Sequence, residues 1–133
     1  MYYFSRSSKE KLITCRLDLQ FICNEAINVM DFSVIWGRRN KQEQNFAYKY
    51  GFSKKKWPES RHNFEPPRLS EAIDLAPYPI DWTDKDRFIL LAGIIKGIAY
   101  ENGIRIRWGG DWDGDNDLKD QTFFDYCHYE ITD

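Results

Sequence analysis

The stretch "DKDRFILLAGIIKGIAYENGIRIRW", residues 84–108, places a long apolar helix directly before a short alternating strand. Asp84 or Thr83 is suited to cap the start of this helix, and Gly103 is suited to end it. After the glycine, residues 104–108 alternate apolar and basic side chains, which is typical of a half-buried strand. A helix that is apolar over most of its surface is a core element. We therefore expect it to lie at the centre of the protein.

The chain before this stretch predicts a second main helix and further strands. From Ser8 to Asn28 apolar residues recur at steps of three and four, which indicates an amphipathic helix. Cys15 and Cys23 fall on that helix, and we expect both to be small buried apolar residues. Residues 32–36 and 71–76 have the composition of strands. Residues 40–51 predict a short helix that ends at Gly51.

Two segments predict loops, and the chain closes with a strand at residues 126–131. Residues 52–70 carry lysines and prolines without a periodic apolar face, and loops of that length are usually functional or disordered. Residues 109–121 are rich in glycine and aspartate. The sum predicts an α+β fold, in which two main helices pack on one face of a small, mostly antiparallel sheet. We expect residues 1–133 to form a single domain.

Composition narrows the classes of function. The 19 basic and 21 acidic residues give a net charge of −2, so the whole molecule has no field that would attract nucleic acid or an anionic membrane. No apolar run reaches the roughly 18 residues of a spanning helix, and the first residues lack the order of a signal peptide. We therefore predict a protein that is first cytoplasmic, without membrane insertion. Its three cysteines match neither a zinc knuckle nor a disulfide framework.

The two histidines are the first candidates for chemistry. A catalytic zinc ion takes three protein ligands and leaves one position for water, so His62, Asp74 and His128 would be a sufficient set. Beside them, Asp125 could serve as general base, and Glu130 could orient a ligand. The competing interpretation is a satisfied structural histidine, with Asp125 as a turn residue and Glu130 as an exposed strand carboxylate. The spacing of these residues leaves both interpretations open.

Four motifs carry a family resemblance: "SRH" at 60–62, "SEAIDLAP" at 70–77, "IRWGGDW" at 106–112 and "DYCHYE" at 125–130. In this order they resemble the M15 family of zinc peptidases, which includes D-alanyl-D-alanine carboxypeptidases, L-alanyl-D-glutamate endopeptidases and phage endolysins. The upstream "GRRNKQEQ", 37–44, is similar to the family's G-x-R-T segment followed by glutamine. Four motifs in the family's order are far more specific than any one of them.

The resemblance implies a fold and a mechanism. The fold would be that of the M15 peptidases, with one Zn²⁺ per chain at the sheet, held by His62, Asp74 and His128, and with Asp125 as general base. Arg39 would stabilise the oxyanion of the tetrahedral intermediate. Ser60 would help to position the substrate. Gln44 and Glu130 would contact the residues of the site and help to orient them.

The chain departs from the family pattern in three places. The spacer between His62 and Asp74 is longer than usual, which we expect to change the rim of the cleft rather than the ligands at its ends. Ser70 stands where the family has glycine. Asn40 replaces a threonine and retains a side chain that can cap a helix.

The function implied is a zinc-dependent peptidase, a monomer of phage endolysin type, that hydrolyses peptidoglycan stem peptides and acts on the wall after release. The bond would be L-alanyl-D-glutamate, or that of a D,D- or L,D-carboxypeptidase. The alternative is a phage virion or tail protein that uses the fold for wall binding or assembly, with weak or no catalysis. The joint presence of His62, Asp74, Asp125 and His128 favours the enzyme.

Two charged segments have simpler interpretations. The aspartates of residues 111–120 alternate like the start of a calcium loop, but the glycine and the final glutamate are misplaced, so we expect a solvated loop. Lys54, Lys55 and Lys56 form a run that is most simply a solvated face. Beside a cleft, the same lysines could attract anionic cell-wall polymers.

Overall fold

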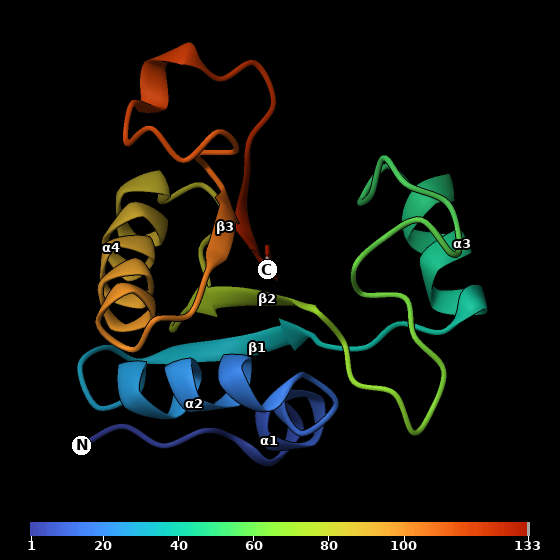
Figure 1. The fold of residues 1–133 in the computed structure, drawn as a ribbon, viewed down its shortest axis with the longest axis horizontal. Helices are drawn as coiled ribbons and strands as arrows, with labels where there is room; N and C mark the ends of the chain where they lie inside the picture. Colours follow the sequence, from blue (N-terminus) through green and yellow to red (C-terminus); the bar gives the residue numbers. More distant parts are fainter. Residues whose placement is uncertain (133) are drawn as a thin grey trace.

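The computed structural model describes residues 1–132 and contains one four-stranded sheet (Figure 1). The strands run antiparallel in the order β1-β2-β4-β3. The elements in chain order are α1 Arg6–Leu12, α2 Leu17–Ala26, β1 Phe32–Trp36, α3 Lys41–Lys49, β2 Ala72–Pro77, α4 Lys85–Glu101, β3 Ile106–Gly109, the 3-10 helix η1 Leu118–Asp120, and β4 Asp125–Ile131. The predicted α+β class and the antiparallel sheet are confirmed.

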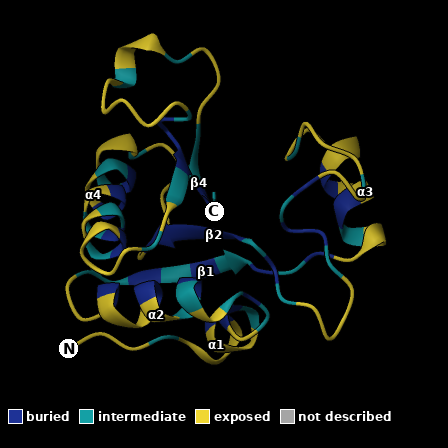
Figure 2. Cartoon of the chain, viewed as in Figure 1, coloured by how far each residue is buried: buried dark blue, intermediate teal, exposed yellow. Residues whose placement is uncertain are grey.

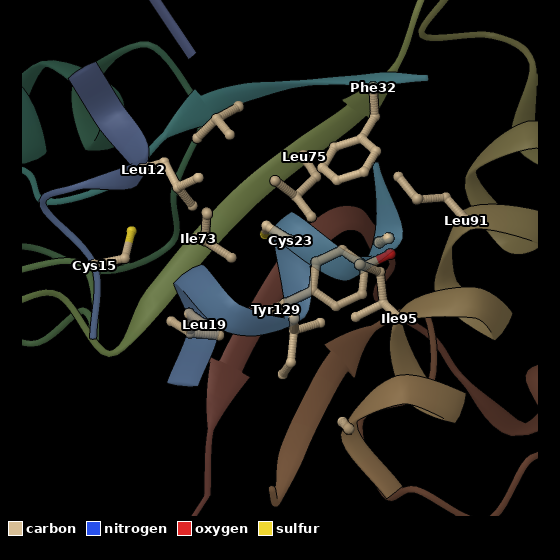
Figure 3. Close-up of a cluster of buried hydrophobic side chains, with 14 of the residues drawn as sticks. Leu12, Cys15, Leu19, Cys23, Phe32, Ile73, Leu75, Leu91, Ile95 and Tyr129 are labelled. Atoms are coloured by element: carbon tan, nitrogen blue, oxygen red, sulfur yellow. The ribbon is translucent and has the colours of Figure 1, made fainter. Parts of the chain in front are cut away.

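Helices α2 and α4 cover one face of the sheet. Helix α4 packs against β2, β3 and β4, and α2 packs against α4, so that their buried sides meet the apolar side chains of the strands (Figures 2 and 3). Leu19, Leu91 and Ile95 of these helices are buried, as are Ile73 and Tyr129 of the sheet. The core therefore lies between the two helices and the sheet, as the apolar stretch 84–108 predicts.

The alternation of the central strands sends different chemistry to the two faces. Neighbouring residues of a strand point to opposite sides, so Ile73 and Tyr129 enter the core while Asp74 and His128 face away from it. Asp74 and His128 are direct partners in the ladder between β2 and β4. A sheet whose one face is fixed by a packed core therefore holds two polar side chains next to each other on the other face.

The first predicted helix is wrong in one respect, because it is two helices. Residues 13–16 break it, and this break is paired with Ser70: the Ser70 amide donates to Thr14 O at 2.8 Å, and the Arg16 amide donates to Ser70 O at 2.9 Å. Cys15 and Cys23 are buried as expected, but Cys15 lies in the break and not on a helix. Tertiary backbone pairing overrides the helical periodicity of the segment.

The ends of α3 and α4 test the predicted caps. Asn40 caps α3 and forms a reciprocal capping box with Glu43, in agreement with the capping role expected of it. Asp84 occupies the cap position of α4, but its side chain makes no capping hydrogen bond. Gly103 follows α4 with φ +68°, a left-handed conformation that favours glycine.

The aspartate-rich loop differs in part from the solvated loop that we expect. Asp113 and Asp115 are exposed, but Asp111 is buried. Asp111 Oδ2 accepts a hydrogen bond from the Asn116 amide and forms an ion pair with Lys96 Nζ at 3.5 Å. Oxygens of Asp111, Asp113 and Asp115 lie within 4.8 Å of one another. Asp111 thus ties this loop to α4. Within residues 1–132, the chain has no helix long and apolar enough to cross a bilayer.

Candidate metal centre and active site

Three buried side chains converge on the face of the sheet opposite the core. His62 Nε2 lies 3.1 Å from Asp74 Oδ1 and 3.3 Å from His128 Nδ1, and His128 Nδ1 lies 3.1 Å from the same carboxylate oxygen. Asp74 and His128 come from paired strands, whereas His62 comes from the long loop before β2. The structure thus brings together the three residues that the sequence proposes as ligands.

Hydrogen bonds behind the cluster fix which histidine nitrogens face it. His62 Nδ1 lies 2.7 Å from Gly37 O, so this nitrogen donates its hydrogen to the carbonyl and leaves Nε2 toward the cluster. His128 Nε2 lies 2.7 Å from Glu130 Oε1, which leaves Nδ1 toward the cluster. The second oxygen of Glu130 is held by Arg61 at 3.1 Å and by Arg107 at 2.8 Å. Both imidazoles are therefore oriented by partners outside the cluster.

The spacing of the three atoms fits a small metal ion. Two ligand atoms around a tetrahedral zinc ion, with bonds of about 2.0–2.1 Å, lie about 3.3 Å apart. The three separations here, 3.1, 3.1 and 3.3 Å, are close to that edge. A set of two imidazoles and one carboxylate also suits such an ion chemically, because it supplies three ligands and leaves a position for water. These residues could hold one metal ion.

Burial and mutual contacts shift the pKa values of the cluster. Burial lowers the pKa of His62, which favours its neutral form. Burial alone would raise the pKa of Asp74, but the two histidines outweigh it and hold the pKa well below its usual range. Burial likewise opposes the charged form of His128, yet hydrogen bonds to Asp74 and Glu130 raise its pKa to about 9. An anionic carboxylate thus lies at the centre of the cluster, where a cation is favoured.

The loop that carries His62 is pinned to the segment after β1. The Arg39 amide donates to His62 O at 2.8 Å, and Arg39 forms an isolated parallel bridge with Asn63. Ser60 Oγ accepts from the His62 amide at 3.2 Å, and Asn63 Oδ1 accepts from the Ser60 amide at 3.1 Å. Ser60, expected to position substrate, therefore also shapes the turn that presents His62.

Arg39 and Gln44 form a buried link behind Asp74. The Arg39 guanidinium donates from Nη2 to Asp74 Oδ2 at 2.9 Å and from Nη1 to Gln44 Oε1 at 3.2 Å, and Trp36 packs beneath it. Gln44 is fully buried and donates to Ser53 Oγ at 2.9 Å and Lys55 O at 2.7 Å. Both terminal nitrogens of Arg39 are thus engaged by the protein. The direct contact with Asp74 makes Arg39 a positioning residue for that carboxylate.

Asp125, the expected general base, begins β4 at the rim of the same cavity. The cavity has a volume of about 80 Å³, which leaves room for water beside the cluster, and its wall includes all three candidate ligands and Asp125. Burial, and then the negative charge of Asp74, raise the pKa of Asp125, and Cys127 Sγ donates to its Oδ1 at 3.1 Å. A carboxylate with a raised pKa is suited to taking up a proton and returning it.

Gly109 allows the backbone of Asp125 to approach β3. The two residues are paired beside an irregularity in the β3–β4 ladder. A β-carbon on Gly109 would overlap the carbonyl oxygen of Asp125 and lie 2.9 Å from its Cβ, closer than real Cβ contacts. The absence of a β-carbon at Gly109 therefore allows β3 and the start of β4 to approach closely at Asp125.

Comparison with known proteins identifies a family match for the chain. The sequence model of the phage L-alanyl-D-glutamate peptidases matches residues 1–132.

The chain belongs to this peptidase family.

The chain is also 30% identical over 140 residues to the L-alanyl-D-glutamate peptidase of Escherichia phage T5, with 98% of each chain covered. The crystal structure of the Serratia marcescens L-Ala D-Glu endopeptidase ChiX matches with a TM-score of 0.75 and 26% identity, over 98% of this chain and 91% of that one. The resemblance to peptidoglycan peptidases of M15 type is confirmed.

Two larger cavities adjoin the one at the cluster of His62, Asp74 and His128 in this family member. A cavity of about 520 Å³ shares Ser60 and Arg61 with it and extends along the long loop before β2. A cavity of about 580 Å³ shares Asp74 and Asp125 with it and has aromatic walls. Those walls include Trp36, Phe46, Phe52, Trp82, Phe123 and Phe124. The two further cavities thus share different parts of the wall of the cavity at the cluster.

Several contributors to the peptidase site were missed by sequence reasoning. Gly37 acts through its carbonyl oxygen, which any residue type could supply, so the sequence carries no signal for it. Arg61 is one of many charged loop residues before folding brings it to Glu130. Gly109 had a usable signal, because a glycine at a strand end often marks a bulge or a close backbone approach. Trp112, whose ring lies 5.7 Å from that of His128, was visible only as part of a motif.

Proposed function

We propose that this chain is a zinc-dependent L-alanyl-D-glutamate peptidase of endolysin type, which hydrolyses peptidoglycan stem peptides. The observation that carries the proposal is the buried convergence of His62, Asp74 and His128 beside Asp125, in a chain of the phage L-alanyl-D-glutamate peptidase family. The relatives named above act on an L-alanyl-D-glutamate bond by their names, which supports the same bond here.

The metal would be held by His62 Nε2, Asp74 Oδ1 and His128 Nδ1. A zinc ion bound by such a set acidifies water and polarises the carbonyl of a scissile peptide. Glu130 fixes the His128 ring, Gly37 O fixes the His62 ring, and Arg39 holds the second oxygen of Asp74. Since partners of this kind set ligand orientation and basicity, the protein presents a preorganised site.

Asp125 performs the proton transfers. Its carboxylate accepts a proton from the attacking water, and the same carboxyl then donates that proton to the amide nitrogen that leaves. Its raised pKa supports both steps, since a carboxyl that holds a proton more readily than usual can both take one up and return it. Ser60 and Arg61, which line the cavity, are placed to contact the peptide that enters it.

The cavities that adjoin the cluster support an endopeptidase. A carboxypeptidase needs a closed end that receives the terminal carboxylate, whereas here one further cavity adjoins the wall at Ser60 and Arg61 and another adjoins it at Asp74 and Asp125. A peptide could therefore enter with residues on both sides of the scissile bond. The phage setting of the family supports synthesis in the cytoplasm of the producing cell and action on its wall after release.

The test combines metal analysis with digestion of defined muropeptides. We expect about one zinc ion per chain, and cleavage products that begin with D-glutamate, identified by mass spectrometry. Asp125→Asn keeps the size of the side chain but removes the base, so we expect it to retain zinc and to lose at least about 100-fold in kcat. A wild-type protein that holds zinc but releases no new amino terminus from any stem peptide would refute the proposed reaction.

A further inference from the structure

Basic side chains of two kinds line the cavity at the His62, Asp74 and His128 cluster: arginines that form ion pairs with carboxylates of the protein, and lysines that, within the described part of the chain, do not. Arg39 is engaged with Asp74, and Arg61 is engaged with Glu71 and Glu130. Lys54 and Lys55 also line the cavity, and among residues 1–132 neither has an acidic partner within ion-pair distance; of the two, only Lys54 also lines the adjoining aromatic cavity. Its ammonium is therefore available to a ligand, whereas the two guanidinium groups already neutralise carboxylates of the protein.

The Lys54 ammonium is held in place. Its Nζ lies 3.9 Å from the centroid of the Phe123 ring, a cation–π contact. The Phe123 ring stacks on Trp112 at 6.0 Å, and Trp112 lies 5.7 Å from the His128 ring. A row of aromatic rings thus connects Lys54 to a candidate metal ligand, and Phe123 stands two residues before Asp125 in the chain.

The backbone around Lys54 is also tied to the site. Gln44 Nε2 donates to Ser53 Oγ on one side of Lys54 and to Lys55 O on the other, and Gln44 Oε1 accepts from Arg39. One buried amide therefore joins the loop of Lys54 to the guanidinium that holds Asp74. Lys54 lines both the small cavity at the cluster and the aromatic cavity beside it, so it stands where the two meet.

The proposed substrate presents an anion that suits such a cation. A D-glutamyl residue has two carboxyl groups, and only one of them can continue the peptide. The other is a free carboxylate on the residue whose nitrogen is part of the scissile bond, unless it is amidated. A substrate-binding cation close to Asp125 would therefore meet this carboxylate directly.

We propose that Lys54 is a specificity-determining residue, whose ammonium binds the free carboxylate of the D-glutamyl residue next to the scissile bond. This inference rests on the proposed function. It assigns the aromatic side of the cleft to the glutamyl half of the substrate. It also predicts discrimination against peptides in which this carboxylate is amidated.

The test uses two synthetic stem peptides that differ only at this group, one with the carboxylate and one with the carboxamide. For the wild type we expect kcat/KM to favour the carboxylate by about tenfold, the size of one charge-assisted hydrogen bond at a partly exposed site. In Lys54→Met the ratio falls close to one, and in Lys54→Arg a preference for the carboxylate remains. Lys56→Met is the matched control, because Lys56 lies over Tyr48 and lines none of the three cavities.

The outcomes separate this inference from the proposed function. If the wild type cleaves both peptides at equal rates, or if Lys54→Met keeps the tenfold preference, the role of Lys54 is refuted while the peptidase assignment stands. If the wild type cleaves neither peptide, the proposed function itself fails. A loss of preference in Lys56→Met equal to that in Lys54→Met would show a general effect of loop charge and would also refute the specific contact.

Discussion

The replacement Gly109→Ala tests how strictly the backbone places Asp125, the proposed general base. A β-carbon there would overlap the carbonyl oxygen of Asp125 and approach its Cβ to 2.9 Å. To restore van der Waals contact, β3 and the start of β4 must separate by about 1 Å. A misplacement of that size at a catalytic group costs roughly 100-fold in rate. We therefore expect kcat on a stem peptide to fall about 100-fold, while the metal ligands remain in place.

The assay compares kcat, zinc content and thermal unfolding of the same preparations. Overpacking of this kind destabilises by about 1–3 kcal/mol, so Tm should fall by roughly 4–12 °C, and the variant should remain folded at 25 °C. Gly97→Ala is the matched control: it makes the same chemical change on α4, where a β-carbon meets nothing within 4 Å. We expect it to leave kcat unchanged and to raise stability by up to about 1 kcal/mol. A folded Gly109→Ala protein with kcat within threefold of wild type would refute the reasoning.

Three further predictions concern the proposed zinc site and the residues around it. Glu130→Gln weakens the hydrogen-bond partner of His128 and should lower zinc affinity about 10- to 100-fold in a chelator competition. Glu71→Gln is the control and should leave zinc affinity unchanged, because Glu71 contacts Arg61 but not the histidine. Equal zinc affinities of the two variants would contradict the orienting role of Glu130. Gln44→Leu leaves the buried groups that hydrogen-bond to the Gln44 amide without partners, so it should lower the free energy of unfolding in urea by roughly 2–4 kcal/mol. A decrease below about 0.5 kcal/mol would show that water replaces the lost hydrogen bonds. Removal of zinc by a chelator should abolish cleavage and lower Tm without unfolding the protein at 25 °C, because the apolar core lies on the other face of the sheet; loss of near-ultraviolet circular dichroism on chelation would argue against this separation.

Much of the fold follows from local patterns. The apolar run of α4, the alternation in β3 and the strand composition of β1, β2 and β4 each predict their own element, because burial on one face imposes a period that a sequence displays. The first helix shows the limit of this logic. Its periodicity continues through residues 13–16, but the backbone there pairs with Ser70, a partner 55 residues away that no local window contains.

The sequence by itself determined the chemical types at the site and their order along the chain. His62, Asp74, Asp125 and His128 stand in motifs of a recognisable family, and alternation in β4 predicts that His128 and Glu130 share a face. Only the tertiary structure decided which residues contact and orient the candidate ligands and Asp125. The contacts of Arg39 with Asp74, of Gly37 with His62 and of Gly109 with Asp125 join segments distant in sequence. They depend on distances within an ångström, which residue types and their spacing do not encode.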